Sequence, residues 1–241
     1  MPRFTAPDYS HLTIRQAIAL QQELRAQIVC EDAFGPVHTV AGVDIGFAPL
    51  ARSRRARHYA GDYRPQASTA RVAVVVLRLP ELTVEEQVVV TCPVAFPYVP
   101  GLLGFREVPA ALEALARLIR PPDMLLCDGQ GYAHPRRCGL ACHLGLLADL
   151  PAIGAAKSRL VGSHAPVGEA RGDWQPLSDA GELIGAALRT RTGANPLYVS
   201  TGHRISPASA LEMVLRCTTR YRLPEPARLA HQLASGDVAQ S

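Results

Sequence analysis

The stretch MLLCDGQGYAHPRRCGLACH, residues 124–143, constrains the fold of this chain more than any other. Residues 124–127 form a short apolar run, which predicts a buried strand. Asp128 follows where that strand gives way to Gly129 and Gly131. Open sheets bind ligands beyond the carboxyl ends of their strands, and glycines there let a base or a phosphate approach the backbone closely. The stretch therefore predicts an acid at the ligand-binding edge of a sheet, although an ordinary Asp-Gly turn has the same spacing.

The composition is that of one folded domain. With 48% hydrophobic and 19% charged residues, a chain of 241 residues can bury one sizeable core, and no linker-like stretch divides it. We expect a single domain over residues 1–233 and a polar, frayed tail over residues 234–241. The net charge of +4 and the pI near 8.8 permit a polyanionic partner without requiring one.

The cysteines and the N-terminus favour a cytoplasmic protein. Most of the 6 cysteines are embedded in apolar runs, which is typical of reduced, buried thiols, so no disulfide framework is expected. The first residues, MPRFTAPDYS, lack the apolar core of a signal peptide. No apolar run approaches the roughly 20 residues needed to cross a bilayer. We therefore expect no interaction with membranes.

The hydrophobic periodicity predicts an α/β fold. The expected helices are residues 13–32, 108–120, 138–150 and a helix that begins at the Ser206-Pro207 cap. The expected strands are residues 37–47, 71–79, 82–91, 124–127, 151–156, 182–189 and 197–200, with a loop or hairpin over residues 161–180. This order predicts a mixed sheet in which a three-strand antiparallel meander is extended by parallel strands, with helices on both faces.

Three acids lie at the ends of predicted elements and could converge on one site. Asp44 lies between Val43 and Ile45, where an unpaired carboxylate is costly; a bound cation or a structural hydrogen bond would relieve this cost. Asp128 ends a strand, and Glu107 lies just before a predicted helix, where an acid also complements the helix dipole. Carboxylate oxygens are the ligands that Mg²⁺ and Mn²⁺ prefer, so metal-assisted phosphodiester hydrolysis is one chemistry this set predicts.

Two cationic positions could serve a phosphate. Lys157 directly follows the predicted strand 151–156, where it could counter charge on a transferring phosphate or simply be a surface lysine. His203 and Arg204 precede the capped helix at Ser206, and anions are favoured at a helix N-terminus.

Two loops are candidates for binding nucleic acid. Prolines stiffen the segment CPVAFPYVPGLLGFREVPA, residues 92–110, so its aromatic residues could form a rigid wedge between bases or pack into the core. The basic run from Arg52 to Arg57 could touch a phosphate backbone or be a solvated surface loop.

A structural zinc site is a weaker alternative. His134, Cys138, Cys142 and His143 fall within one short stretch. Their spacing is not that of a two-knuckle zinc site, and the two cysteines lie on a helix that is apolar nearly all round. The sequence also has neither a Walker-type phosphate loop nor a G-x-S-x-G elbow, so nothing points to acyl transfer.

Taken together, these segments resemble the endonuclease V family, which nicks nucleic acid near deaminated bases such as inosine. The matching segments span nearly the whole chain: VAGVDIGF (40–47), PYVPGLLGFRE (97–107), DGQGYAHPRRCGLACHLGLL (128–147), PAIGAAKSRLVG (151–162), STGHRIS (200–206) and YRLPEPARLAH (221–231). The resemblance implies a ribonuclease H-like fold. It also implies hydrolysis of the second phosphodiester 3′ to the lesion, leaving 3′-hydroxyl and 5′-phosphate ends.

The resemblance also implies roles for individual residues. Catalytic roles fall on Asp44, Glu107, Asp128, Lys157 and His203, with Asp44, Asp128 and Glu107 as metal ligands for Mg²⁺ or, as a substitute, Mn²⁺. The wedge corresponds to Pro97, Tyr98, Val99 and Pro100. The base pocket corresponds to Gly101, Leu103, Gly129, Gly131, Gly139 and Leu160, with His134 and Arg136 beside it as phosphate or backbone contacts.

The implied partner is DNA containing deaminated bases, with RNA left open, and the chain is expected to act as a monomer. Two other functions stay open: a non-catalytic nucleic-acid-binding module of the same fold, and a ribonuclease H-like nuclease without lesion preference. The chain departs from the family at Gly104, where a serine or larger residue is expected and a looser loop would result. It also departs at Cys142, where serine is usual, and in the length of the basic run around Arg52 to Arg57.

Overall fold

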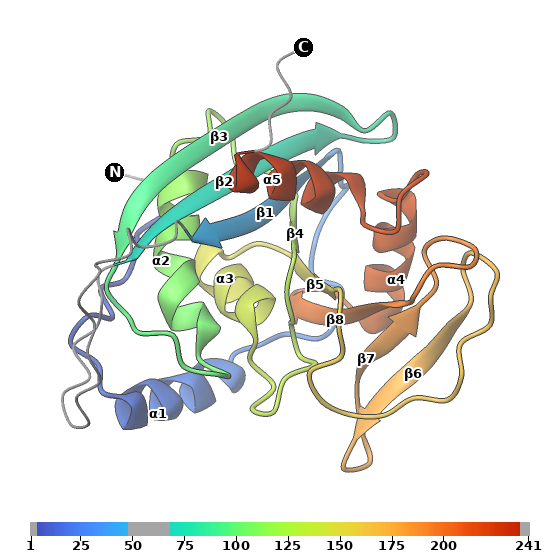
Figure 1. The fold of residues 1–241 in the computed structure, drawn as a ribbon, viewed down its shortest axis with the longest axis horizontal. Helices are drawn as coiled ribbons and strands as arrows, with labels where there is room; N and C mark the ends of the chain where they lie inside the picture. Colours follow the sequence, from blue (N-terminus) through green and yellow to red (C-terminus); the bar gives the residue numbers. More distant parts are fainter. Residues whose placement is uncertain (1–3, 48–67, 237–241) are drawn as a thin grey trace, which may run out of the picture.

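A mixed sheet of eight strands forms the centre of the structure (Figure 1). The computed structural model describes residues 4–47 and 68–236, so the basic run from Arg52 to Arg57 lies outside the described residues. The strands are β1 (Thr39–Phe47), β2 (Ser68–Arg78), β3 (Thr83–Val94), β4 (Met124–Cys127), β5 (Ala152–Ala156), β6 (Trp174–Asp179), β7 (Glu182–Leu188) and β8 (Leu197–His203). The helices are α1 (Ile14–Arg25), α2 (Leu103–Leu115), α3 (Leu140–Ala148), α4 (Pro207–Arg216) and α5 (Glu225–Ser235).

The strand order is β3-β2-β1-β4-β5-β8-β7-β6. Strands β1, β2 and β3 form an antiparallel meander, and β4 and β5 run parallel to β1. Strands β8, β7 and β6 then continue the sheet in antiparallel pairs. The predicted meander with a parallel extension is therefore confirmed. Beyond β5 the sheet continues with three antiparallel strands, β8, β7 and β6.

Helices cover both faces of the sheet. Leu112 of α2 and Leu144 of α3 belong to one buried cluster with the meander strands. Met213 of α4 and Ala227 of α5 belong to a second cluster with Leu126 of β4 and other central strand residues. Because the central strands are apolar on both sides, they need a helical layer on each face. In the part of the chain that the structure describes, no helix is long and apolar enough to cross a membrane.

Helix α2 begins at Leu103, earlier than the predicted start at Val108. Pro109 suggested a first-turn proline, but it lies inside the helix. Gly101, with φ of 79°, instead marks the end of the preceding loop. Glu107 consequently belongs to the body of α2, where it is only 6% exposed, rather than to a helix start. The predicted dipole-complementing position of this acid is wrong.

Helix α5 was not predicted from the sequence. Its prolines lie at the N-cap, Pro224, and in the first turn, Pro226, where a missing N–H costs little. The backbone of α5 packs directly on β1, because a Cβ added to Gly42 would lie 1.9 Å from the Pro226 carbonyl oxygen. Only glycine allows this approach. Strand β6 is a second addition, within residues 161–180 that were expected to form a loop or hairpin.

Gly104 does not loosen the chain after the proline-rich loop. A Cβ at this position would lie 2.6 Å from Nδ1 of His143, so the glycine lets α2 pack closely on α3. His143 is buried, its Nε2 lies 2.8 Å from the Tyr9 hydroxyl, and its Nδ1 has no hydrogen-bond partner among the described residues. Burial lowers the pKa of His143 to about 3.

This histidine makes the protein sensitive to acid. Its pKa lies below the ordinary value near 6.5, so the unfolded chain binds a proton that the folded chain excludes. The free energy of unfolding should therefore fall by about 1 kcal/mol per pH unit as the pH drops from 6.5 toward 4. Denaturant unfolding at several pH values measures this slope. His143→Gln should reduce this slope. An unchanged slope in that variant would mean that another titratable group causes the sensitivity to acid.

Candidate active site

Two of the predicted acids lie side by side at the carboxyl ends of neighbouring parallel strands. Asp44 belongs to β1 and Asp128 directly follows β4, and the register pairs Val43 with Cys127. The convergence predicted for Asp44 and Asp128 thus results from the parallel pairing of β1 and β4, which brings equivalent strand ends to one edge.

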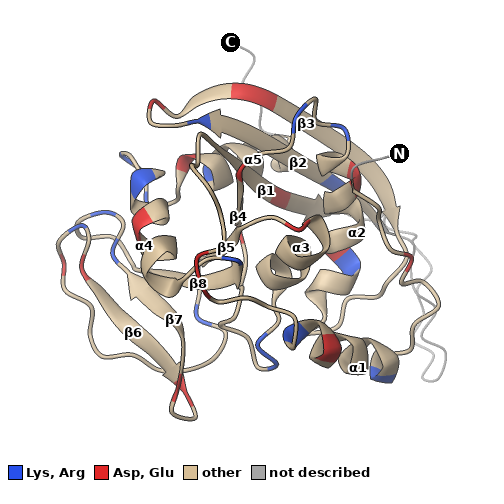
Figure 2. Ribbon diagram, turned by 180° about the vertical axis from the view of Figure 1, so that it is seen from behind, with Lys and Arg blue, Asp and Glu red and all other residues tan. Residues whose placement is uncertain are grey.

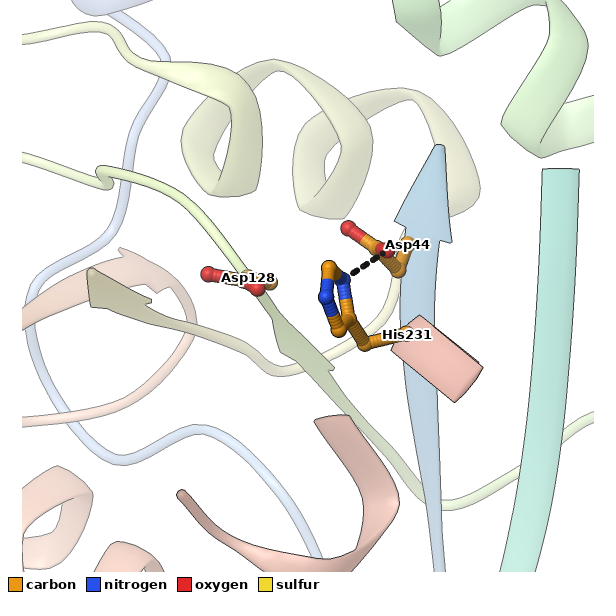
Figure 3. A group of neighbouring side chains, drawn as sticks. All are labelled: Asp44, Asp128 and His231. Atoms are coloured by element: carbon orange, nitrogen blue, oxygen red, sulfur yellow. Dashed lines mark hydrogen bonds and ion pairs between the residues drawn. The ribbon is translucent and has the colours of Figure 1, made fainter. Parts of the chain in front are cut away.

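A histidine from α5 completes this group (Figure 3). One ligand atom from each of Asp44, Asp128 and His231 lies within 4.8 Å of the other two. Nδ1 of His231 is 2.9 Å from Oδ2 of Asp44. We call these three residues the carboxylate–histidine group. His231 received no role from the sequence, although it ends the segment YRLPEPARLAH on which the family resemblance partly rests.

Two glycines of β1 bring α5 close enough for this interaction. Gly42 accommodates the Pro226 carbonyl, and a Cβ on Gly46 would lie 2.9 Å from the Ala234 carbonyl oxygen. Gly42 and Gly46 have the same parity as Asp44 along the strand, so all three face the helix. A side chain at either glycine would push the helix outward and carry His231 away from Asp44.

Glu107, the third predicted metal ligand, is buried in α2 and is not one of the residues that make up the carboxylate–histidine group. Burial is the main cause that raises its pKa to about 8; the charges of Asp44 and Asp128 act in the same direction, and Arg106 opposes them. These influences place the Glu107 carboxylate within electrostatic reach of both aspartates. Clustered carboxylates repel one another, and a bound cation is the usual way in which proteins relieve that repulsion.

Lys157 reaches the group from β5. Its ammonium lies 2.6 Å from Oδ2 of Asp128, so it is not a surface lysine without a partner, the alternative that its position after the strand had left open. Its backbone is held by Arg222, whose guanidinium donates hydrogen bonds to the carbonyls of Lys157 at 2.7 Å and Pro196 at 2.8 Å. Arg222 received no role from the sequence, although it lies in the same segment YRLPEPARLAH as His231.

His203 does not join the group. Strand β8 runs antiparallel to β5, and His203 pairs with Ala152 at the start of β5, whereas Lys157 follows the end of β5. The side chain is 3% exposed, and its Nδ1 accepts a hydrogen bond from the backbone N–H of Val29 at 3.4 Å. The structure therefore does not bring His203 to the carboxylate–histidine group: the antiparallel direction of β8 places it beside the start of β5, whereas Lys157 follows the end of β5.

A cavity of about 410 Å³ opens beside Asp128 and Lys157. Of the predicted wedge and base-pocket residues, those that line it are Tyr98, Val99, Pro100, Gly101, Leu103, Gly129, Gly139 and Leu160, together with His134. Tyr98 is 63% exposed at the rim, as a wedge residue must be to reach between bases. The cavity is mostly apolar and lined by glycine backbone, which suits a flat aromatic ligand.

Three of the residues predicted for the wedge, the base pocket and the phosphate contacts do not line the cavity. Gly131 allows β8 to pass closely, because a Cβ there would lie 2.2 Å from the Thr201 carbonyl oxygen. Arg136 donates hydrogen bonds to the Gly101 carbonyl at 2.6 Å and to the Gln21 side chain, so it braces the loop before α2. Pro97 is the third.

Comparison with known proteins agrees with this geometry. The family model of Endonuclease V matches residues 22–232. Endonuclease V of Roseiflexus castenholzii is 53% identical over 220 residues, 91% of this chain and 91% of its own. The crystal structure of endonuclease V from Streptomyces avermitilis matches with a TM-score of 0.82 at 38% identity, covering 97% of both chains. Ciona intestinalis endonuclease V, crystallised with a 23-mer DNA containing an inosine followed by a ribo-adenosine, matches with a TM-score of 0.75 at 25% identity, covering 94% of this chain and 98% of that chain.

These relatives share the mixed sheet with helices on both faces, which is the ribonuclease H-like arrangement that the resemblance implied. The family match covers far more than half of the chain, and it includes β1, β4 and α5, the elements that carry the carboxylate–histidine group. The chain belongs to the endonuclease V family and is an endonuclease.

Proposed function

We propose that this endonuclease uses Mg²⁺ to cut DNA beside deaminated bases, hypoxanthine above all, at the second phosphodiester on the 3′ side of the lesion. The observation that carries the proposal is the cavity. It lies directly against Asp128 and Lys157, so a base held there would place its own strand across the carboxylate–histidine group. The relative from Ciona intestinalis, crystallised with inosine-containing DNA, supports the same substrate for this chain.

The donor atoms suit a hard divalent cation. Asp44 and Asp128 offer carboxylate oxygens and His231 an imidazole nitrogen within 4.8 Å of one another, and the charges of both aspartates raise the pKa of Glu107. Oxygen donors favour Mg²⁺, and an added imidazole is compatible with Mn²⁺ as a substitute. When bound, such a cation supplies charge stabilisation for the phosphate and activates water for attack.

The remaining chemistry falls on the protein's own side chains. Lys157 can place its ammonium against a non-bridging phosphate oxygen, because the Asp128 carboxylate holds it at the edge of the cavity. His231 is hydrogen-bonded to Asp44, which fixes the orientation of its ring and leaves Nε2 available for a ligand or a proton. Tyr98 and its neighbours at the cavity rim fill the gap that an extruded base leaves in the stack.

Tyr98→Ala is expected to weaken recognition of the lesion more than the chemistry. Aromatic stacking on a base contributes about 1 to 3 kcal/mol, so KM for an inosine strand should rise roughly tenfold while kcat changes little. Steady-state kinetics on a labelled oligonucleotide measures both constants. Equal KM values for Tyr98→Ala and the unmodified enzyme would show that Tyr98 does not act as a wedge residue.

The proposed function is tested by incubating the enzyme and Mg²⁺ with matched strands that differ only in one inosine-for-adenosine exchange. Cleavage of the inosine strand at the second 3′ phosphodiester, abolished by chelation, is the expected result. Equal cleavage of both strands would indicate a nuclease without lesion preference. Running the same pair as RNA decides whether the sugar matters. Gel filtration tests the further proposal that the chain acts as a monomer.

A further inference from the structure

A basic surface with an aromatic centre lies between α4 and α5. The guanidinium carbon of Arg220 lies 4.7 Å from the centre of the Tyr221 ring, and that of Arg228 lies 4.6 Å from it. Tyr221 is 37% exposed, and Arg220 is exposed as well. We call these three residues the α4–α5 surface. Figure 2 shows basic segments near the end of α4 and the start of α5.

The positive charge of this surface is only partly neutralised. Arg228 pairs with Glu225 at 2.5 Å, and no ion pair links Arg220 to a carboxylate in the part of the chain that the structure describes. Arg222, the next residue after Tyr221, points toward β5 and binds the Lys157 carbonyl. Arg220 therefore offers an exposed guanidinium group. Arg228 is half-buried, with Nε and Nη2 bonded to Glu225 and Nη1 to Gln232, and adds positive charge beside it. Because both groups are held against one aromatic ring, they present an oriented site for a phosphate group.

The surface adjoins the carboxylate–histidine group. Arg228 and His231 are three residues apart on α5, so they lie on the same face of that helix. On the other side, Arg222 connects the same loop to Lys157. Both connections are short, so the surface lies within a few nucleotides of the place where a phosphodiester would be cut.

The carboxylate–histidine group connects the cavity to the α4–α5 surface: Asp128 lines the cavity and lies within 4.8 Å of His231, and His231 is three residues from Arg228 on α5. Asp128 and Lys157 line the cavity, whereas Asp44, His231 and the residues of the α4–α5 surface do not. A strand with one base in the cavity and its cleavable phosphate at Asp128 would therefore continue toward α5. Since the cut falls on the 3′ side of the lesion, the continuing segment is the one that leaves as the 5′-phosphate product.

We propose that the α4–α5 surface binds the sugar-phosphate backbone of the strand 3′ to the cut, through Arg220 and Arg228 with Tyr221 orienting both guanidinium groups. The proposal rests on the proposed function, since it needs a strand anchored in the cavity. It assigns a sequence-independent role to Arg220, Tyr221 and Arg228, which the chemistry at the carboxylate–histidine group does not use. Guanidinium groups on a backbone give affinity without reading bases.

The test compares Arg220→Gln with the unmodified enzyme on inosine strands that carry either about ten or about two nucleotides beyond the cut, a range set by typical single-strand site sizes. On the long flank, KM should rise several-fold with kcat unchanged. The slope of log KM against log salt should become shallower by about 0.7, the value expected when the protein neutralises one phosphate fewer on a single strand. On the short flank, the variant and the unmodified enzyme should behave alike.

Further variants separate charge from folding. Arg120→Gln removes an exposed arginine that lines a separate hollow with Glu86 and Asp123, and it should leave both flanks unaffected. Arg220→Lys should retain part of the long-flank advantage, and Tyr221→Leu should lose more of it than Arg220→Gln because both guanidinium groups lose their support.

The inference and the proposed function fail in different ways. If the unmodified enzyme cuts inosine strands with the same KM and salt slope on both flanks, the α4–α5 surface does not bind the 3′ segment, while the proposed function stands. A loss in Arg220→Gln that is equal on both flanks would likewise overturn the inference. Absence of inosine-dependent cleavage by the unmodified enzyme would instead overturn the proposed function.

Discussion

Asp128→Asn should lower kcat on an inosine-containing DNA strand by roughly a thousandfold while substrate binding is largely retained, because a metal ion's charge stabilisation is worth several kcal/mol. The substitution keeps the size of the side chain but removes a carboxylate that lies within 4.8 Å of Asp44 and His231 and pairs with Lys157 at 2.6 Å. Single-turnover cleavage measures the chemical step, and fluorescence anisotropy with a labelled strand measures binding. Asp44→Asn should have an effect of the same size.

Asp149→Asn is the matched control for these variants. Asp149 is an exposed acid that pairs with Arg204 at 2.6 Å, and its φ of 54° is a conformation that asparagine tolerates well. Removing its charge should leave kcat unchanged. If Asp128→Asn and Asp149→Asn were equally active, the carboxylate–histidine group would not be the catalytic centre.

His231→Ala should lower kcat by about a hundredfold, within the range observed when a positioned acid–base or ligand side chain is removed. His231 bonds to Asp44 from an exposed position on α5, so its loss should leave the fold intact. The unfolding midpoint should therefore change little, and a large drop in it would mean that α5 had been displaced.

His203 provides the comparison that decides between the two histidines. It is buried beside the start of β5, away from Lys157, and its ring accepts a hydrogen bond from the Val29 N–H. His203→Gln should therefore lower stability while kcat of the folded enzyme is maintained. The reverse outcome, in which His203→Gln loses activity and His231→Ala keeps it, would restore the role that the family resemblance suggested for His203.

Much of the fold follows from local patterns. The apolar run of residues 124–127 and the acid after it predicted a buried strand with a carboxylate at its end, and β4 with Asp128 is what the structure has. Asp44 was predictable for a different reason: it lies within a strand between β-branched apolar residues, where a carboxylate needs a partner. The helix cap at Ser206 was also correct, since its side chain accepts a hydrogen bond from the Ser209 N–H.

The sequence was least informative about two things: the direction of a strand relative to its neighbour, and the close approach of one backbone segment to another. A strand's residues do not show whether it runs parallel or antiparallel to its neighbour, and that alone places His203 far from Lys157. His231 could not be found from periodicity, because its helix starts with prolines and its position depends on Gly42 admitting the Pro226 carbonyl. Glycines spaced four apart beside Asp44 were the available signal that another backbone packs there.

Glu107 shows a different limit. Its resemblance to the family's acid was visible, but its burial inside α2 and the raised pKa of about 8 depend on packing between distant elements. The sequence suggested a helix-start acid because Pro109 resembles a first-turn proline. Only the assembled sheet brings its carboxylate within electrostatic reach of Asp44 and Asp128.

The most direct measurement is the anomalous scattering of Mn²⁺ in crystals of the enzyme with an uncleaved inosine strand. A peak within about 2 to 2.5 Å of carboxylate oxygens of both Asp44 and Asp128, with the hypoxanthine in the cavity beside them, is the predicted result. A peak bound only elsewhere, or a base that remains stacked in the strand while the cavity stays empty, would contradict it.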